Sequence, residues 1–157
     1  MRARIQEEGL DASRAFGAAL ERVLAKLREL LPVEEAAPRP ILISGMASSS
    51  IGWRELPYAC LPFPLDGSGA RWQEIERVGE HRVFVFSGLA AESDVLRGEE
   101  TEVLGLAAGG ALAPFREQAL LVLPGTHSKH VRIEAGSITG FSTYMTGELF
   151  EVHGLET

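Results

Sequence analysis

The chain has little cysteine, little positive charge and no long hydrophobic run, and each shortage excludes a class of protein. Cys60 is the single cysteine among 157 residues, which excludes an intrachain disulfide and a cysteine-based zinc site and suits a reducing cytoplasm. Fifteen Lys and Arg against 22 Asp and Glu give a formal net charge of -7, which does not attract nucleic acids or anionic membranes. No apolar stretch is long enough to cross a bilayer, and acidic residues close to Met1 argue against a signal peptide. We therefore expect a cytoplasmic protein that binds neither nucleic acid nor a membrane.

What the chain does contain is the composition of a globular protein, with 45% apolar and 24% charged residues. Apolar residues at helical spacing predict an amphipathic helix from Ser13 to Leu31, ended by Pro32. Three short runs are apolar throughout, without alternating polar residues, as strands buried on both faces are: 41–44, 83–86 and 120–123. Such strands with helices between them predict an α/β sheet.

Two further regions have a different pattern of apolar and polar residues. From Val131 to Tyr144 apolar residues mix with polar ones around a turn at 135–137, which predicts a meander of hairpin strands, and the pattern after Tyr144 predicts a helix start. Gly52–Ala70 holds three prolines and is too irregular for a helix. It is expected to be a long ordered loop, a kind of segment that is more often functional than not.

Three polar segments combine residue types that suit a substrate or a phosphate, and each also has a purely structural explanation. Ser44–Trp53 follows a buried strand with glycines and hydroxyls, as ligand-binding loops of α/β sheets do, or is a connecting loop with a serine cap. In Asp94–Glu102 a helix is expected to start near Glu99, where a carboxylate either accepts a proton from a substrate hydroxyl or simply caps the helix. Pro124–His130 offers N–H groups, hydroxyls and Lys129 to a phosphate, or forms a polar hairpin turn.

The last of these segments also contains two histidines, His127 and His130. A metal-dependent hydrolase would use such residues as ligands. Two histidines without an assigned carboxylate partner make a weak metal site, and solvated or hydrogen-bonded histidine is the simpler interpretation.

The polar segments, taken in order along the chain, resemble the 2-dehydro-3-deoxygalactonokinase family. The resemblance rests on four blocks: Ser44–Ser49 with Gly52–Trp53 and Pro57–Tyr58, Asp94–Thr101, Pro124–Lys129, and Phe141 with Met145–Leu149. It implies an actin/hexokinase/Hsp70-like (ribonuclease H-like) sugar kinase fold of the α/β class. It further implies phosphorylation of 2-dehydro-3-deoxygalactonate to its 6-phosphate with ATP and Mg²⁺, in cytoplasmic galactonate catabolism. The expected partners are the sugar acid and the nucleotide, and association of the chain with itself is left open.

The resemblance also assigns roles to residues. The catalytic base is expected to be Glu99, with Glu100 as the alternate. The residues expected to hold the sugar acid are Ser48, Ser49, Ser50, Trp53 and Arg97. The residues expected to face the nucleotide phosphates are Gly125, Thr126, Ser128 and Lys129, and no residue is assigned as a metal ligand.

Two landmarks of the family are missing from the sequence, and this shapes the expected domain organisation. No Asp-x-Gly-Thr phosphate turn precedes Arg2, and the chain ends at Thr157 soon after the last block. The resemblance therefore implies an incomplete kinase, with residues 1–119 as the remainder of a first actin-like half and 120–157 as the opening strands of a second. Residues 2–9 would be the remnant of a strand. The chain is then expected to be inactive by itself, and a non-catalytic sugar-acid-binding protein or degenerate remnant is the alternative.

Overall fold

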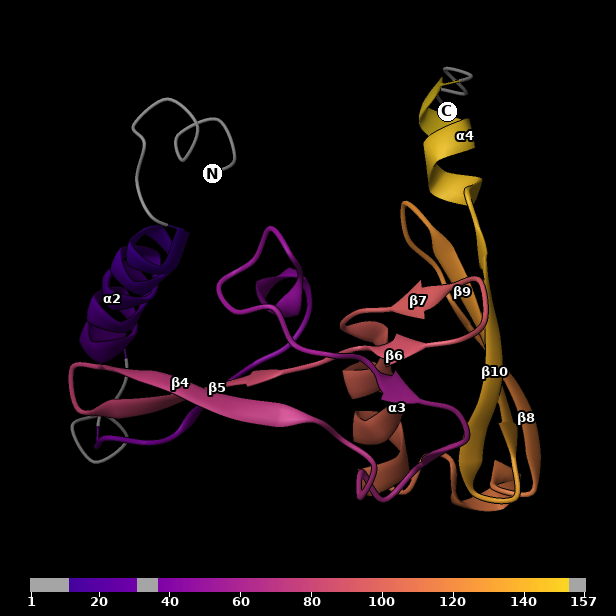
Figure 1. The fold of residues 1–157 in the computed structure, drawn as a ribbon. Helices are drawn as coiled ribbons and strands as arrows, with labels where there is room; N and C mark the ends of the chain where they lie inside the picture. Colours follow the sequence, from indigo (N-terminus) through magenta and orange to yellow (C-terminus); the bar gives the residue numbers. More distant parts are fainter. Residues whose placement is uncertain (1–11, 31–36, 153–157) are drawn as a thin grey trace. The chain divides into compact units, whose positions relative to one another are not determined.

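The computed structural model describes residues 12–30 and 37–152, which form two compact units (Figure 1). Unit 1 contains the described residues up to Leu56 together with Trp72–Phe86. Unit 2 contains Pro57–Arg71 and the described residues from Ser87 onward, so the chain passes between the units three times. The expected boundary between residues 119 and 120 falls inside unit 2 and stays a prediction about the halves of a duplicated fold. The strand expected at residues 2–9 lies outside the described residues.

In its described residues, unit 1 has a three-stranded sheet with one α-helix packed on it. The helix α2 (Ala12–Leu30) confirms the one expected from apolar spacing. The sheet has the order β1–β5–β4, in which β1 (Ile41–Ile43) runs parallel to β5 (His81–Phe86), and β4 (Trp72–Val78) runs antiparallel to β5. A two-residue turn, with Gly79 at a φ of 61°, joins β4 to β5. Glycine adopts such a positive φ without strain.

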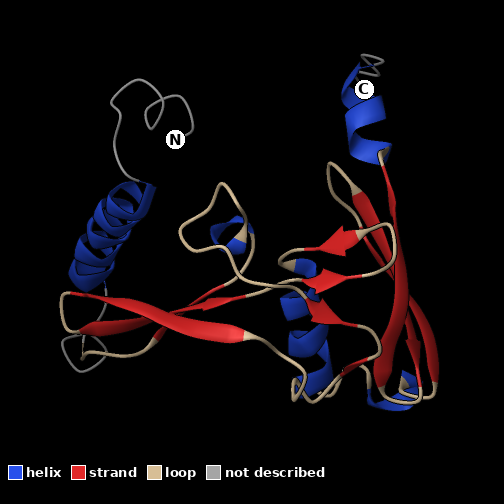
Figure 2. Cartoon of the chain, in the orientation of Figure 1, coloured by secondary structure: helices blue, strands red, loops and turns tan. Residues whose placement is uncertain are grey.

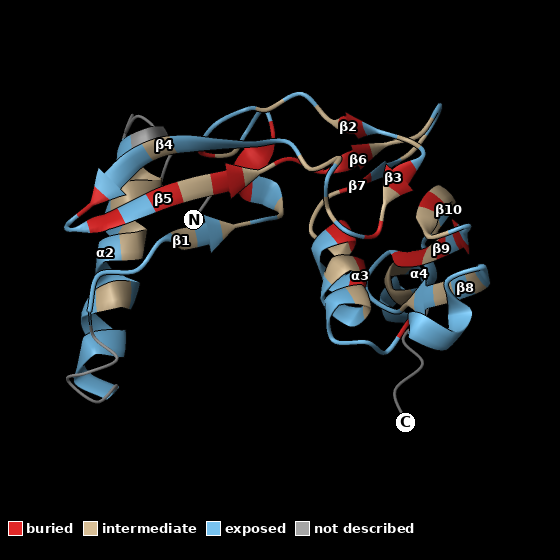
Figure 3. Cartoon of the chain, turned by 90° about the horizontal axis from the view of Figure 1, so that it is seen from below, coloured by how far each residue is buried: buried red, intermediate tan, exposed pale blue. Residues whose placement is uncertain are grey.

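The core of unit 1 lies between the sheet and α2. Valines from β5 that are fully buried alternate with less buried residues, as the banding of that strand in Figure 3 shows. Phe16 of α2 stacks on Trp53, with ring centroids 5.7 Å apart. Trp53 is thus a core residue of this unit, and its expected contact with substrate stays a prediction. The buried residues of the unit 1 core are Ala47, Trp53, Val78, Val83 and Val85.

The described residues of unit 2 form two small sheets and two α-helices (Figure 2). One sheet has the order β3–β10–β9–β8 and is antiparallel throughout, with β3 (Phe63–Pro64), β8 (Gln118–Leu123), β9 (Ser128–Glu134) and β10 (Ser137–Tyr144). The other has the order β2–β6–β7, formed by β2 (Ala59–Cys60), β6 (Leu89–Ala90) and β7 (Val95–Leu96). The helices are α3 (Glu99–Ala108) and α4 (Thr146–Val152), and two 3-10 turns of the chain are η1 (Met46–Ser48, in unit 1) and η2 (Ala113–Phe115).

Four expectations for this part of the chain are confirmed. The β8–β9–β10 meander has its tight turn at Ala135 and Gly136, with φ values of 47° and 71°, and α3 and α4 begin at Glu99 and Thr146. The proline-rich stretch 52–70 is irregular apart from the short strands β2 and β3. Its Phe63 is buried in the core of unit 2.

Two of the strands expected to be buried on both faces are not buried in this way. Leu42, at the centre of β1, is 66% exposed. The same expectation is also wrong for residues 120–123. These residues lie in β8, at one edge of the antiparallel sheet, where intermediate and exposed positions alternate. Leu120 and Val122 are 63% and 50% exposed, because the inner residues of β8 already face the core and no other described element covers the outer face. The class prediction nevertheless holds at the level of a mixed α/β protein, with parallel pairing at β1–β5 and β2–β6. No helix within residues 12–30 and 37–152 is long and apolar enough to span a membrane.

Candidate functional site

The serine-rich loop after β1 belongs to unit 1, and two of its hydroxyls hold the loop in shape. Ser48 Oγ donates a hydrogen bond to Gly45 O at 3.1 Å, and Ser49 Oγ donates one to Met46 O at 2.8 Å. Both serines are buried, whereas Ser50 is exposed. Side-chain bonds of this kind to the backbone are typical of turns, as the connecting-loop interpretation requires. Substrate binding by Ser48, Ser49 and Ser50 stays a prediction.

The start of α3, in unit 2, carries both candidate catalytic carboxylates. Gly98 precedes the helix with a φ of 115°, a conformation that favours glycine, and has no side chain with which to cap it. The glutamates reach back instead: the Glu99 carboxylate accepts from the N–H of Arg97 at 2.8 Å, and the Glu100 carboxylate accepts from the N–H of Gly98 at 2.7 Å. The expected start of a helix near Glu99, with carboxylates in its first turn, is confirmed. The same bonds fix both carboxylates at the start of the helix.

The two glutamates differ in burial. Glu100 is only 3% exposed, and burial raises its pKa even though hydrogen bonds from the backbone oppose the change. A carboxyl with a raised pKa weakens the folded state at neutral pH, and this penalty fades as the pH falls through the native pKa toward the unfolded value near 4.5. Glu99 is half-buried, so it is the more accessible of the two to a ligand.

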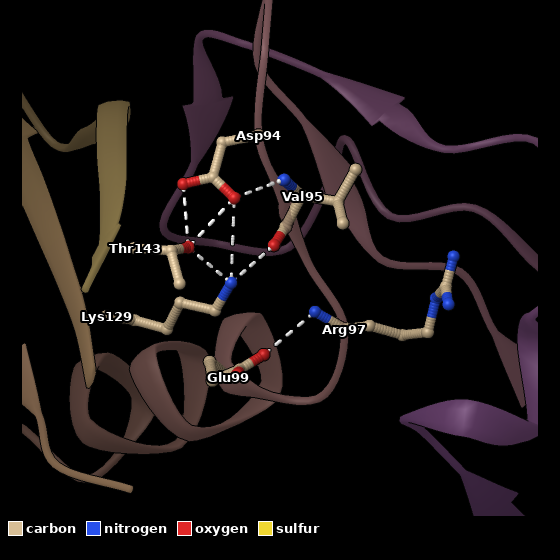
Figure 4. Close-up of polar contacts among 6 residues, drawn as sticks. All are labelled: Asp94, Val95, Arg97, Glu99, Lys129 and Thr143. Carbon is tan, nitrogen blue, oxygen red and sulfur yellow. Dashed lines mark hydrogen bonds and ion pairs between the residues drawn. The ribbon is translucent and has the colours of Figure 1, made fainter. Parts of the chain in front are cut away.

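Arg97 lies between these carboxylates and β7. Its guanidinium carbon stands 4.9 Å from the centre of the Tyr58 ring, a cation–π arrangement that orients the side chain. Figure 4 shows the guanidinium directed away from the cluster of Asp94, Lys129 and Thr143. A guanidinium held in this way suits a carboxylate, which it binds through two parallel hydrogen bonds.

The glycine-containing turn between β8 and β9 is the candidate phosphate turn. Gly125 and Thr126 are exposed, whereas Ser128, at the first position of β9, is buried. The start of α4 lies against this turn, because the N–H of Glu148 donates to Thr126 O at 3.1 Å. His127 Nε2 also lies 2.9 Å from Glu148 Oε2. The turn is therefore braced from one side and open to solvent at its glycine and threonine.

Gly147 allows that close approach, and we expect Gly147→Ala to destabilise unit 2. A Cβ at this position would lie 2.5 Å from Gly125 O and 2.8 Å from Thr126 Cα, so the backbone of the turn would have to move. Overpacking of this kind costs about 1–3 kcal/mol, which denaturant unfolding of the chain would measure. The matched control is Gly105→Ala in α3, where a Cβ meets no atom within 4 Å. That control should gain about 0.5–1 kcal/mol, and equal stability of the two variants would contradict the account.

A partly buried polar network connects β9, the strand after the turn, to the segment before α3 (Figure 4). Lys129 Nζ donates to Val95 O at 2.8 Å and to Thr143 Oγ1 at 2.5 Å, and lies 3.6 Å from Asp94 Oδ1. The Thr143 hydroxyl in turn donates to the Asp94 carboxylate, 2.8 Å from Oδ1 and 2.7 Å from Oδ2. Asp94 Oδ1 also accepts from the N–H of Val95 at 2.7 Å. The network thus joins β9, β10 and the β6–β7 hairpin.

Asp94 is charged in this network at neutral pH. Burial pushes its pKa upward, but the hydrogen bonds from Thr143 and Val95 and the charge of Lys129 outweigh burial, so its pKa lies below the ordinary value near 3.8. A carboxylate of this kind stabilises the folded state above its unfolded pKa, and the stabilisation is lost as the pH falls through the native pKa. Asp94 and Lys129 are therefore an ion pair at neutral pH, with side chains 23% and 10% exposed.

The two histidines of the turn region have separate neighbours. His127 pairs with Glu148, whereas the His130 ring packs against the Tyr144 ring, with centroids 4.5 Å apart. Among the described residues, no group of three or more His, Cys, Asp and Glu side chains lies close enough together to hold a metal ion. The geometry therefore does not unite His127 and His130 in one ligand set.

The structure brings together Arg97, Glu99, Glu100 and Lys129 in unit 2, while the serine loop and Trp53 belong to unit 1. Sequence reasoning missed the network partners Asp94 and Thr143. Asp94 opens the block 94–101, and Thr143 lies between Phe141 and Met145 of the last block. The available signal was an acidic residue and a hydroxyl residue in polar segments on either side of Lys129. That Asp94 pairs with Thr143, 49 residues further along the chain, is visible only in the folded protein.

Comparison with known proteins supports the family resemblance that rests on the four sequence blocks. The family model for 2-keto-3-deoxy-galactonokinase matches residues 2–155. The chain is 40% identical over 126 residues to "Probable 2-dehydro-3-deoxygalactonokinase DgoK1" of Rhizobium meliloti (strain 1021), covering 78% of this chain and 40% of the relative. It is 37% identical over 114 residues to the 2-dehydro-3-deoxygalactonokinase of Escherichia coli (strain K12), covering 70% of this chain and 36% of the relative.

A solved structure gives the same result. The crystal structure of "a putative 2-dehydro-3-deoxygalactonokinase protein from Sinorhizobium meliloti" matches 93% of this chain and 46% of its own, with a TM-score of 0.72 and 37% identity. The chain thus spans about 40% of the length of the curated relatives that it matches. Since the family model covers nearly every residue, this chain belongs to the 2-keto-3-deoxy-galactonokinase family of carbohydrate kinases.

Proposed function

We propose that this chain contributes to the ATP-dependent phosphorylation of 2-dehydro-3-deoxygalactonate at its terminal hydroxyl, within an actin/hexokinase-like fold. The observation that carries the proposal is the family match over residues 2–155. The names of two curated relatives support the same substrate. The cytoplasm as the site of the reaction and galactonate catabolism as its context are parts of the same proposal.

Glu99 is the proposed base. Its carboxylate is half-buried and held at the start of α3 by the N–H of Arg97. In the reaction the substrate hydroxyl gives its proton to this carboxylate as its oxygen forms a bond to the γ-phosphorus, and the bond from phosphorus to the ADP oxygen breaks. Glu100 is the weaker candidate, since its burial and its hydrogen bond to Gly98 leave it less accessible to a hydroxyl.

The sugar acid carries a carboxylate, and Arg97 is the proposed contact for it. A guanidinium binds a carboxylate through two hydrogen bonds in one plane. The stacking of Arg97 on Tyr58 limits the number of positions that the guanidinium visits, which lowers the entropy cost of binding. The loop Ser48–Ser50 and Trp53 complete the proposed substrate-binding set.

The turn from Gly125 to Ser128 is proposed to face the nucleotide phosphates. Gly125 and Thr126 are exposed, and a glycine-containing turn between strands offers N–H groups and a hydroxyl to an anion. This donor chemistry fits phosphate. Mg²⁺ keeps most of its ligands as water and phosphate oxygens, so it needs at most one or two carboxylates from the protein, and it would neutralise charge on the transferred group.

The proposal is tested in a chimera in which this chain replaces the corresponding segment of the Escherichia coli kinase. We expect the purified chimera to release ADP in the presence of ATP, Mg²⁺ and 2-dehydro-3-deoxygalactonate, because the segment is 37% identical to its counterpart. The matched control omits the sugar acid. A folded chimera that binds the sugar acid without turnover would favour the alternative of a non-catalytic, sugar-acid-binding remnant, and one that neither binds nor reacts would refute both.

A further inference from the structure

Lys129 is the basic residue closest in sequence to the proposed phosphate turn, yet its side chain points away from solvent into the network of Figure 4. An ammonium group has three hydrogens to donate. Lys129 Nζ has three oxygen neighbours: Val95 O, Thr143 Oγ1 and Asp94 Oδ1. Val95 O and Thr143 Oγ1 therefore take two of the three hydrogens, and binding a phosphate would require the ammonium to leave these bonds and the partly buried carboxylate 3.6 Å away.

We propose that Asp94, Lys129 and Thr143 form a clamp that positions the β7–α3 segment, with Lys129 as a positioning residue and not a phosphate ligand. The proposal rests on the proposed kinase function for its catalytic part, whereas its structural part stands on the contacts alone. The clamp is defined by the three side chains and by the backbone of Val95, which both donates to Asp94 and accepts from Lys129.

The clamp lies close in sequence to the proposed catalytic residues and can therefore fix their position. Lys129 is the second residue of β9 and follows the phosphate turn directly, while Val95 is the first residue of β7. From Val95 it is two residues to Arg97 and four to Glu99, whose carboxylate holds the N–H of Arg97. The segment is thus held at both ends, by the clamp at Val95 and by the glutamates at the start of α3.

The Thr143 hydroxyl links the two charged side chains of the clamp. Thr143 lies opposite Lys129 in the β9–β10 pairing, and its hydroxyl accepts from the ammonium while donating to the carboxylate. It therefore links the two charges without carrying charge itself. A phosphate site at Lys129 would have no need of this hydroxyl, so Thr143 distinguishes the two roles of the lysine.

The first experiment needs no catalytic activity. Amide hydrogen exchange is measured on the 157-residue chain for the peptide covering residues 95–101, with β8, which holds no member of the clamp, as the internal reference for folding. We expect Thr143→Val, which keeps the shape and removes the hydroxyl, to speed exchange there about tenfold, because a buried hydrogen-bond partner is lost. Thr143→Ser keeps the hydroxyl and should match the unsubstituted chain. Unchanged exchange in Thr143→Val would overturn the proposal.

The second experiment separates the two roles of Lys129 in the chimera. If Lys129 positions the segment, Lys129→Met and Thr143→Val should each lower kcat about ten- to a hundredfold, as misplacement of catalytic groups does, with the KM for ATP unchanged. The double variant should be no worse than either single one, because both remove the same device. A raised KM for ATP in Lys129→Met alone, with Thr143→Val near normal, would instead make Lys129 a phosphate ligand.

Each failure has a separate meaning. A chimera without kinase activity refutes the proposed function and leaves the exchange result standing, while unchanged exchange refutes the clamp even in an active chimera. If Lys129→Met does not fold, because the partly buried Asp94 then lacks its counter-charge, the Thr143→Val variant alone tests the proposal, since it leaves both charges in place.

Discussion

Glu99→Gln should lower kcat of the chimera at least about a hundredfold while the KM for the sugar acid stays within a factor of a few, as loss of a general base does. Glutamine keeps the size of the side chain and retains an oxygen that accepts from the N–H of Arg97, so the turn before α3 should survive. What it loses is the capacity to take up the proton of the substrate hydroxyl. Initial rates at varied ATP and sugar acid measure the effect.

Glu100→Gln is the matched control for this experiment. It makes the same chemical change one residue further along, at a buried side chain whose amide oxygen would still accept from Gly98. Because burial raises the pKa of Glu100, the neutral amide should also make the folded state more stable at pH 7, with the gain shrinking as the pH falls toward 4.5. Near-normal turnover in Glu99→Gln with a large loss in Glu100→Gln would move the role of base to Glu100.

The second large effect is expected of the 157-residue chain by itself, which should show no measurable kinase turnover. Phosphoryl transfer in the proposed fold requires phosphate contacts from two opposed turns and a site closed to water. The described residues supply one candidate phosphate turn, Gly125–Ser128. The chain matches only 36–40% of the length of the curated relatives. Loss of a preorganised contact to the transition state costs about 3–4 kcal/mol, and the part of the chain that the structure describes offers candidate contacts from one such turn.

A coupled ADP-release assay on the purified chain, with ATP, Mg²⁺ and 2-dehydro-3-deoxygalactonate, measures this. Size-exclusion chromatography accompanies it, because exposed apolar side chains on β8 and α4, such as Leu120 and Phe150, favour association. The control is the active chimera at the same concentration. Robust turnover by a monodisperse chain would show that the proposed assignment of the phosphate contacts is wrong.

Much of the local structure follows from the sequence because its causes are local. Helical spacing and Pro32 predict α2 to within one residue at each end, and the glutamates after Gly98 predict the start of α3. The turn at Ala135–Gly136 follows from small residues between apolar runs. The strand at 120–123 is also predicted, but its burial is not, since the layer that covers a strand is made of residues distant in the chain.

By itself the sequence determined the family, through four ordered blocks, together with the mixed α/β class and the segments in which polar side chains gather. It did not determine how those side chains are used. Lys129, read along the chain, belongs to a phosphate turn; in the folded protein its ammonium contacts Val95, Thr143 and Asp94. Only tertiary structure decided this, because a buried ammonium takes the oxygen partners that the packing of β9, β10 and the β6–β7 hairpin brings within reach, whatever their distance in sequence.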